Sequence, residues 1–128
     1  YRLEKVLESG LTVNLQLRSE LNLKMARLAD GDRAQFDFVF EVSWPLVLRL
    51  ARKTTKGADE AEDVAQLALM KVFSRASEFD KGRDALSWIL GITSYECMTL
   101  KQKIRRRKEN QAGNEELLAI ADSSMNPE

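Results

Sequence analysis

The chain contains no histidine and a single cysteine, Cys97, among its 128 residues. Without histidine, neither a Ser-His-Asp triad nor a Cys-His nucleophile can be assembled. A zinc site built from cysteine and histidine ligands is excluded for the same reason. One cysteine cannot form a disulfide within the chain, which fits a reducing compartment. These absences remove the commonest hydrolase and zinc chemistries.

Long apolar runs are missing as well. The longest have about five residues, such as Leu117–Ala121, whereas a membrane-spanning helix needs roughly 20. No signal-peptide pattern opens the chain. We therefore expect no membrane partner. Because the sequence begins with Tyr1 rather than Met, we also expect it to be a fragment of a longer protein.

Proline and glycine are scarce, with two and six residues, and no alternation of apolar and polar residues is long enough to predict a strand. A chain of this length buries one hydrophobic core. The sequence therefore predicts an all-α fold, a compact helical bundle. The expected helices run over Leu15–Ala29, from about Arg33, and over Pro45–Thr54, Asp59–Ser77 and Asp84–Lys108.

Local signals set the ends of these helices. Asp30-Gly31-Asp32 predicts a stop followed by a new N-cap, and Asp59 is expected to cap a helix whose first turn is acidic. Pro45 predicts a kink or the first turn of a second helix. The helix that starts near Arg33 is expected to bury Phe36, Val39 and Phe40.

The charges are segregated along the chain. Lys plus Arg and Asp plus Glu each number 20, so the net charge is zero, which alone argues against a nucleic-acid partner. Yet residues 81–108 carry eight bases and two acids, or +6, residues 59–80 carry −4, and residues 109–128 carry five acids and no base, or −5. Such blocks direct partner choice, although solvated helix faces are the alternative interpretation of any one block.

The helix predicted over Asp59–Ser77 has two unlike faces at 100° per residue. The expected core face collects Ala61, Val64, Ala65, Ala68, Leu69, Val72 and Ala76. The opposite face collects Asp63, Gln66, Leu67, Met70 and Ser74. Large apolar side chains beside polar ones are typical of a protein-docking patch. Single exposed apolar residues are also common, so an ordinary solvated face stays open.

The helix predicted over Asp84–Lys108 combines aromatic and basic residues. Trp88, Tyr95 and Gln102 are spaced seven apart on one stripe, with Thr99 and Arg106 close to it. Six of the eight residues from 101 to 108 are basic. Basic side chains bind phosphates without reading sequence, and exposed rings stack on unpaired bases. We expect Tyr95 to be exposed; a core position for Trp88 and a solvated helix end for the bases are the alternatives.

Several segments together resemble a known family. These segments are Ala61–Phe73, Phe79–Arg83, Ser87–Ile92 and Arg105–Arg107. They are similar to the second conserved region of bacterial sigma factors, nearest to the extracytoplasmic-function group of the sigma-70 family. The segment Gly31–Phe36 and the central Pro45 also fit that domain, so the resemblance covers about residues 30–108.

The resemblance implies a cytoplasmic bacterial initiation factor that is not an enzyme and needs no cofactor. The helix over Asp59–Ser77 would dock on the clamp coiled coil of the RNA polymerase beta-prime subunit. The loop Ser77–Asp84 would hold a flipped base of the promoter minus-ten element, and the next helix would separate the strands and grip the non-template strand. The polymerase-binding residues would be Glu62, Asp63, Gln66, Leu67 and Met70. The DNA-binding residues would be Phe79, Lys81, Arg83, Trp88, Tyr95, Thr99, Lys101, Gln102, Lys103, Arg105, Arg106 and Arg107.

Four positions depart from the pattern of the family that the chain resembles. Leu67 stands where the family usually has Glu, and Tyr95 where it usually has Asn. Thr99 and Gln102 replace the usual Asp and Arg. Polymerase binding is therefore better supported than ordinary promoter recognition. Two rivals stay open: a sigma-like protein-interaction domain, with polymerase or an anti-sigma protein as partner, and an unrelated helical adaptor.

The resemblance also divides the chain into three parts. Residues 1–29 form an N-terminal extension with one helix, which either covers a face of the bundle or adds a regulatory element. Residues 30–108 form the sigma region 2-like domain. Residues 109–128 form an acidic linker toward a second DNA-binding domain that is missing here, with a short helix expected over Asn114–Ala121 and a linker over Ser123–Glu128.

Overall fold

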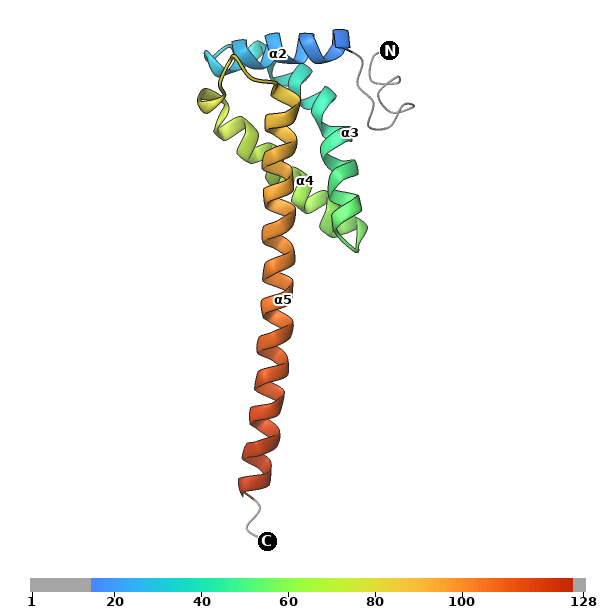
Figure 1. Cartoon of the computed structure of the whole chain (residues 1–128), viewed down its shortest axis with the longest axis vertical. Coiled ribbons are helices and arrows are strands. Elements are labelled where there is room, and N and C mark those ends of the chain that lie inside the picture. The colour runs from blue at the N-terminus through green and yellow to red at the C-terminus, as the bar shows by residue number, and fades with distance from the viewer. Residues whose placement is uncertain (1–14, 126–128) are drawn as a thin grey trace. The chain divides into compact units, whose positions relative to one another are not determined.

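The computed structural model describes the backbone of residues 15–125 and the side chains of residues 15–113. The elements are α2 (Leu15–Ala29), the 3-10 turn η1 (Arg33–Gln35), α3 (Phe36–Thr54), α4 (Ala58–Ser74), the 3-10 turn η2 (Ala76–Glu78) and α5 (Ala85–Met125) (Figure 1). No strand occurs between residues 15 and 125, and the all-α prediction is confirmed.

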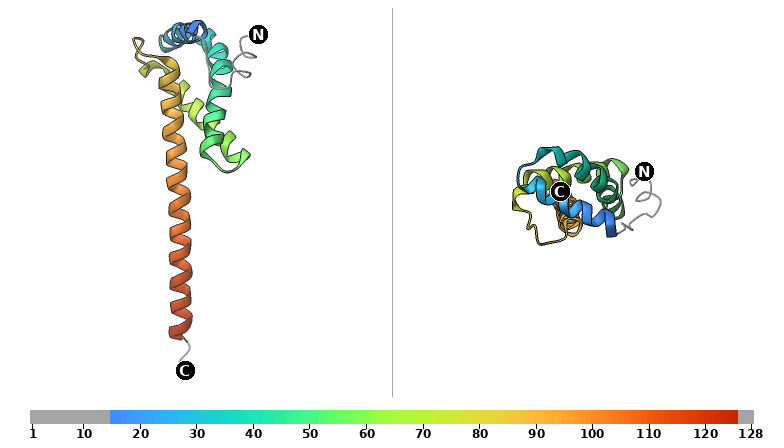
Figure 2. Two further views of the ribbon diagram at one scale, coloured as in Figure 1. Left: turned by 45° about the vertical axis from the view of Figure 1, so that its right-hand side comes forward. Right: turned by 90° about the horizontal axis from the view of Figure 1, so that it is seen from above.

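The chain forms two units, residues 1–97 and residues 98–128. Within the first unit, α2 lies across the N-terminal end of α3 and beside the loop that leads into α5, while α4 packs against α3 (Figure 2). The contact between α3 and α4 is more extensive than that between α2 and α3. The described part of the second unit is the stretch of α5 that follows Cys97.

The hydrophobic core lies in the first unit. On α2, Leu17, Leu21 and Met25 follow one another at helical spacing and are fully buried, which confirms the helix predicted from their pattern. All seven residues assigned to the core face of α4 and η2 are buried as expected. The remaining core side chains include Val39, Val42, Leu46, Val47 and Ala51 from α3 and Ala85, Leu86, Ile89 and Cys97 from α5.

The second helix expected to begin at Pro45 is not there, because α3 runs without a break from Phe36 to Thr54. Proline inside a helix removes one backbone hydrogen bond, to the carbonyl four residues earlier, and costs about 3 kcal/mol. That carbonyl belongs to Glu41, an exposed residue. Burial of Val42, Leu46 and Val47 around the proline offsets the cost and keeps the two halves in one helix.

The burial predicted for Phe36 and Phe40 is wrong, whereas that of Val39 is confirmed. Phe36 is 43% exposed, and Phe40 is exposed as well. Three apolar residues at spacings of three and four look like a core face in sequence. In the fold, Val39 points into the bundle while the two rings lie on its outer side, where they pack against other rings.

Three helix ends differ from the prediction. The cap of α4 is Gly57 rather than Asp59, which lies in the first turn, and α4 ends at Ser74, with the separate turn η2 after it. Asp32, by contrast, is the predicted N-cap and accepts a hydrogen bond from the Ala34 backbone N–H at 3.1 Å. The last helix, α5, continues past Lys108 to Met125. Gly113 costs only about 1 kcal/mol relative to alanine inside a helix, so it does not end α5.

Candidate protein-docking and nucleic-acid-binding sites

The outward face of α4 is exposed as its periodicity predicts. Its five candidate residues, which we call the α4 docking face, are all exposed: Glu62, Asp63, Gln66, Leu67 and Met70. The Met70 side chain is 67% exposed, a large fraction for an apolar residue on a helix whose other side is core. Acidic and amide groups border two apolar side chains, an arrangement that suits a protein partner.

A row of aromatic rings continues this face, and the sequence did not reveal it. Leu67, Met70 and Phe73 follow one another at intervals of three along α4, so they are neighbours on its surface. The Phe73 ring lies 4.3 Å from that of Phe36 on α3, centroid to centroid. Phe40 stacks on Phe36 at 6.1 Å, and Trp44 stacks on Phe40 at 5.9 Å. The helical spacing of these α3 residues was visible, but their outward direction was not.

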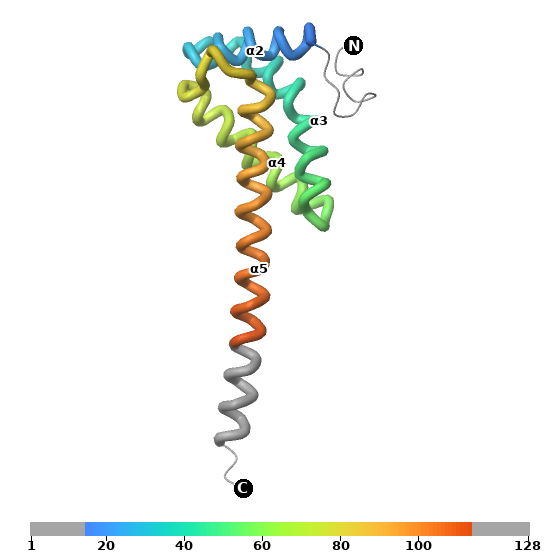
Figure 3. The backbone as a smooth tube through the Cα atoms, in the orientation of Figure 1, coloured from blue at the N-terminus to red at the C-terminus, as the bar shows by residue number. Residues whose placement is uncertain are grey.

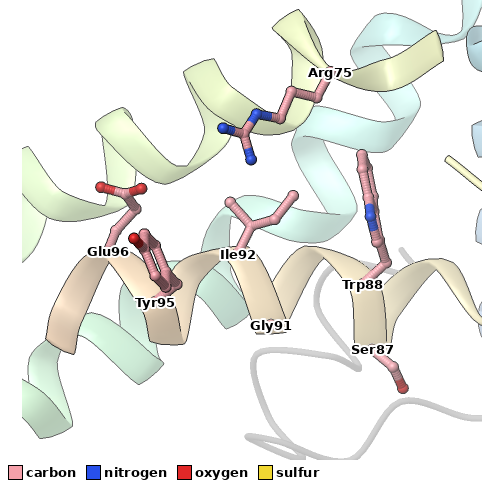
Figure 4. A pocket seen from close by; sticks show the side chains of 7 residues that line it. All are labelled: Arg75, Ser87, Trp88, Gly91, Ile92, Tyr95 and Glu96. Carbon is pink, nitrogen blue, oxygen red and sulfur yellow. The ribbon is translucent and has the colours of Figure 1, made fainter. Parts of the chain in front are cut away.

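A pocket of about 370 Å³ lies between the end of α4 and the first turns of α5 (Figure 4). Trp88 and Tyr95 stand on the same side of α5 with Ile92 between them, and Arg75 reaches over from the end of α4. Tyr95 is 60% exposed, as expected, and Trp88 is half-buried, so neither ring belongs to a closed core. The pocket is lined by Arg75, Ser87, Trp88, Gly91, Ile92, Tyr95 and Glu96.

A buried carboxylate forms one wall of this pocket. Glu96 on α5 is 4% exposed, and its Oε1 lies 2.5 Å from the Nζ of Lys71 on α4. Burying a carboxylate is unfavourable unless it is paired. The ion pair therefore joins the two helices that form the pocket and keeps their spacing.

The loop between η2 and α5 carries three of the predicted DNA contacts. The Phe79 ring is only 4% exposed and packs against the Trp88 ring at 5.3 Å between centroids. In this position Phe79 supports Trp88, and it would have to turn outward to stack on a base. Lys81 forms an ion pair with Asp30, and Arg83 forms one with Asp80, from Nε to Oδ2 at 3.5 Å. Both basic side chains are exposed.

The remaining predicted DNA contacts lie on α5 in the second unit. Thr99 is half-buried. The others are all exposed: Lys101, Gln102, Lys103, Arg105, Arg106 and Arg107. Successive positions turn by 100°, so these side chains surround the helix rather than form one face.

Two other kinds of site are absent from the described part of the chain. No three acidic, cysteine or histidine side chains there are grouped so that they could hold a metal ion. No helix there combines the length and the apolarity that a membrane crossing needs.

The described residues thus form an α-helical domain with an exposed apolar face bordered by acids on α4 and an aromatic pocket at the start of α5. The family model described as Sigma-70 region 2 matches residues 40–109. The chain therefore belongs to the sigma-70 region 2 family, a family of transcription initiation factors that are not enzymes.

Curated relatives agree with this assignment. The chain is 26% identical over 113 residues to the ECF RNA polymerase sigma factor SigK of Mycobacterium tuberculosis H37Rv, with 88% of this chain and 57% of SigK covered. It is 30% identical over 112 residues to SigM of the same strain, with 87% and 55% covered. The chain thus spans a little over half the length of the curated relatives it matches. No solved structure matches it.

Proposed function

We propose that this domain is the part of a transcription initiation factor that binds core RNA polymerase and recognises and melts the promoter minus-ten element. The observation that carries the proposal is the coexistence of two separate surfaces in a region 2 chain. One is the α4 docking face, and the other is the aromatic pocket at the start of α5. We place its action in the bacterial cytoplasm, where polymerase works.

The α4 docking face is proposed to bind the clamp coiled coil of the beta-prime subunit. Met70 and Leu67 supply apolar contact area, while Asp63 and Gln66 supply hydrogen bonds at the border. The neighbouring ring of Phe36 extends the apolar surface onto α3. A partner helix with aliphatic side chains and basic residues beside them would complement this surface.

Binding to an isolated clamp coiled coil tests the docking proposal. We expect the parent chain to bind, and Asp63→Arg and Gln66→Ala to weaken binding because they remove the polar contacts of the face. Met70→Glu should weaken it further, since it places a charge in the apolar part. The control is Glu109→Gln, which removes an exposed acid of α5 outside the α4 docking face. No binding by the parent, or full binding by both polar variants, would refute the docking proposal.

The pocket is proposed to hold an unpaired base of the non-template strand. Trp88 and Tyr95 are seven residues apart, which corresponds to about 10.5 Å along a helix. Bases stack about 3.4 Å apart, so the space above Ile92 accommodates a base on either ring. Arg75 can contact a phosphate or a base edge from the other side. Stacking adds about 1–3 kcal/mol per base.

Affinity for fluorescein-labelled single-stranded 15-mers of random sequence, measured across salt concentrations, tests this part. We expect binding that weakens steeply with salt, because the basic residues of α5 displace counterions. Trp88→Ala and Tyr95→Ala should each weaken it about tenfold through lost stacking, whereas Tyr95→Phe should retain most of it. A flat salt response, or unchanged affinity in both alanine variants, would refute the assignment.

A sigma-like protein-interaction domain that does not read promoters is the second candidate. Tyr95, Thr99 and Gln102 favour it, since they depart from the residues expected at DNA-reading positions. Its partner would be polymerase or an anti-sigma protein, bound through the α4 docking face. Clamp binding without single-strand binding in the two assays above would support it.

A further inference from the structure

The loop that leads into α5 is held by α2, a helix outside the residues matched by the family model. Arg18 on α2 donates two hydrogen bonds to Asp84, from Nε to Oδ1 at 2.8 Å and from Nη2 to Oδ2 at 2.6 Å. Asn22 accepts a hydrogen bond through its Oδ1 from the Ala85 backbone N–H at 2.7 Å. The loop passes alongside α2 just before α5 begins (Figure 3).

These contacts complete the first turn of α5. The first N–H groups of a helix have no partner within it. Asp84 accepts two hydrogen bonds from Ser87, one from the backbone N–H at 2.9 Å and one from the side-chain Oγ at 2.7 Å. Asn22 accepts the hydrogen bond from the Ala85 backbone N–H. Arg18 also donates from Nη2 to the Ser87 Oγ at 3.2 Å. The helix α2 therefore holds Ser87, which lines the aromatic pocket.

Arg18 and Asn22 are held in place because α2 itself is anchored in the core. Arg18 and Asn22 are four residues apart, so they share one face of the helix. The adjoining Leu17, Leu21 and Met25 are fully buried, which prevents α2 from sliding. A guanidinium that binds both oxygens of a carboxylate fixes orientation as well as distance. The end of the loop is thus tied to a helix that is itself anchored in the core.

We propose that Arg18 and Asn22 are positioning residues for single-strand binding. They hold the end of the loop and the first turn of α5 so that Trp88 and its pocket stay in the arrangement that receives a base, without touching the DNA. This inference rests on the proposed DNA-binding function. It assigns the N-terminal helix a role in DNA binding, since α2 becomes part of the framework of the DNA site.

The test uses the full chain with Arg18→Ala, Arg18→Lys and Asn22→Ala, and Arg27→Ala as matched control. Arg27 is an exposed base at the other end of α2, so its removal changes the charge of the same helix equally. Three quantities are measured at a temperature where circular dichroism shows every variant folded. They are affinity for the random single-stranded 15-mers, affinity for the clamp coiled coil, and amide hydrogen exchange of residues 80–87.

We expect Arg18→Ala to weaken single-strand binding about tenfold, the effect of losing one bidentate charged pair. Arg18→Lys should bind more tightly than Arg18→Ala, because lysine keeps the positive charge although it cannot bind both carboxylate oxygens of Asp84 as the guanidinium does. Exchange in residues 80–87 should accelerate, whereas clamp affinity and the Arg27→Ala control should stay within twofold of the parent.

Two results would overturn the inference. Unchanged single-strand affinity in Arg18→Ala and Asn22→Ala would show that the contacts do not serve DNA binding. An equal loss of DNA and clamp affinity would show a merely structural role. A parent chain that binds no single strand at all would instead refute the proposed DNA function, and the positioning role with it.

Discussion

At the scale of single residues, the ion pair between Lys71 and Glu96 joins α4 to α5. The two partners are unequal, because Glu96 is buried while the Lys71 side chain is 36% exposed. When Glu96 is neutralised, the lysine can still be hydrated. When Lys71 is removed, the carboxylate is left in a site that water barely reaches.

We therefore predict unequal effects of two substitutions on the free energy of unfolding. Lys71→Met should lower it by about 2–4 kcal/mol, because a buried charge loses its partner. Glu96→Gln should lower it by only about 1 kcal/mol, the cost of one weakened hydrogen bond. Urea unfolding followed by circular dichroism measures both. Equal losses would mean that Glu96 is solvated in the absence of Lys71.

A second residue-scale prediction concerns the ion pair between Lys81 and Asp30. Both side chains are more than half exposed, so the ion pair adds little to the stability of the fold. However, it occupies Lys81, which is proposed to bind a DNA phosphate. Asp30→Asn should raise affinity for single-stranded 15-mers about twofold at low salt, with the gain lost at high salt. Fluorescence anisotropy measures the effect.

The control for this prediction is Asp37→Asn, which removes an exposed acid of α3. If both variants raise the affinity equally, the gain reflects net charge alone, and the specific competition between Asp30 and phosphate is wrong.

At the scale of elements, the beginning of α5 depends on an ionised carboxylate. The Arg18 guanidinium holds the pKa of the Asp84 carboxyl well below its usual range, and hydrogen bonds from Ser87 act in the same direction against partial burial. A carboxylate whose pKa is lower in the folded state stabilises the fold above its unfolded pKa. That contribution is lost as the pH falls below about 4 toward the folded value.

We predict that the free energy of unfolding of the parent decreases as the pH is lowered from 5 to about 2, partly through Asp84. In Asp84→Asn the decrease should be smaller, and the two stability curves should converge at acidic pH. Urea unfolding at a series of pH values checks this. A constant difference between parent and variant over the whole range would contradict the role of the ionised group.

Element prediction from the sequence succeeded where one helix face is continuously apolar. The periodicity of Leu17, Leu21 and Met25 is local information, and so is that of the buried face of α4. It failed at Pro45, where a local signal for a break competes with the burial of the residues around it. It failed also after Lys108, where α5 continues through the short helix expected over Asn114–Ala121. Local penalties of a few kcal/mol are outweighed when the neighbouring turns are stable.

At the scale of the whole molecule, α2 is part of the core of the first unit rather than an addition to it. Its residues Leu17, Leu21 and Met25 are fully buried, and the helix contacts α3 and the turns η1 and η2. The sequence left open whether this helix covers the bundle or regulates it. The burial, together with the bonds of Arg18 and Asn22, makes it a structural component.

We predict that the chain truncated to residues 30–128 does not unfold cooperatively. Removing α2 exposes the surface that Leu17, Leu21 and Met25 cover, and each such side chain is worth about 2–5 kcal/mol by comparison with its replacement by alanine. That sum is comparable with the total stability of a small domain. Thermal unfolding followed by circular dichroism measures it. A sharp transition within a few degrees of the parent would contradict the prediction.

The sequence by itself determined the all-α class, the core face of α4 and the exposure of the opposite face, because each depends on the spacing of residues along a helix. It also determined the family, because the residue identities of several segments together match that family. Only the tertiary structure decided that Phe36 and Phe40 face outward, that Phe79 lies against Trp88, and that Arg18 bonds Asp84, 66 residues away. Periodicity determines which side chains share a face. Which of those faces is buried, and which distant groups meet, depends on how the helices pack, and that is a property of the whole chain.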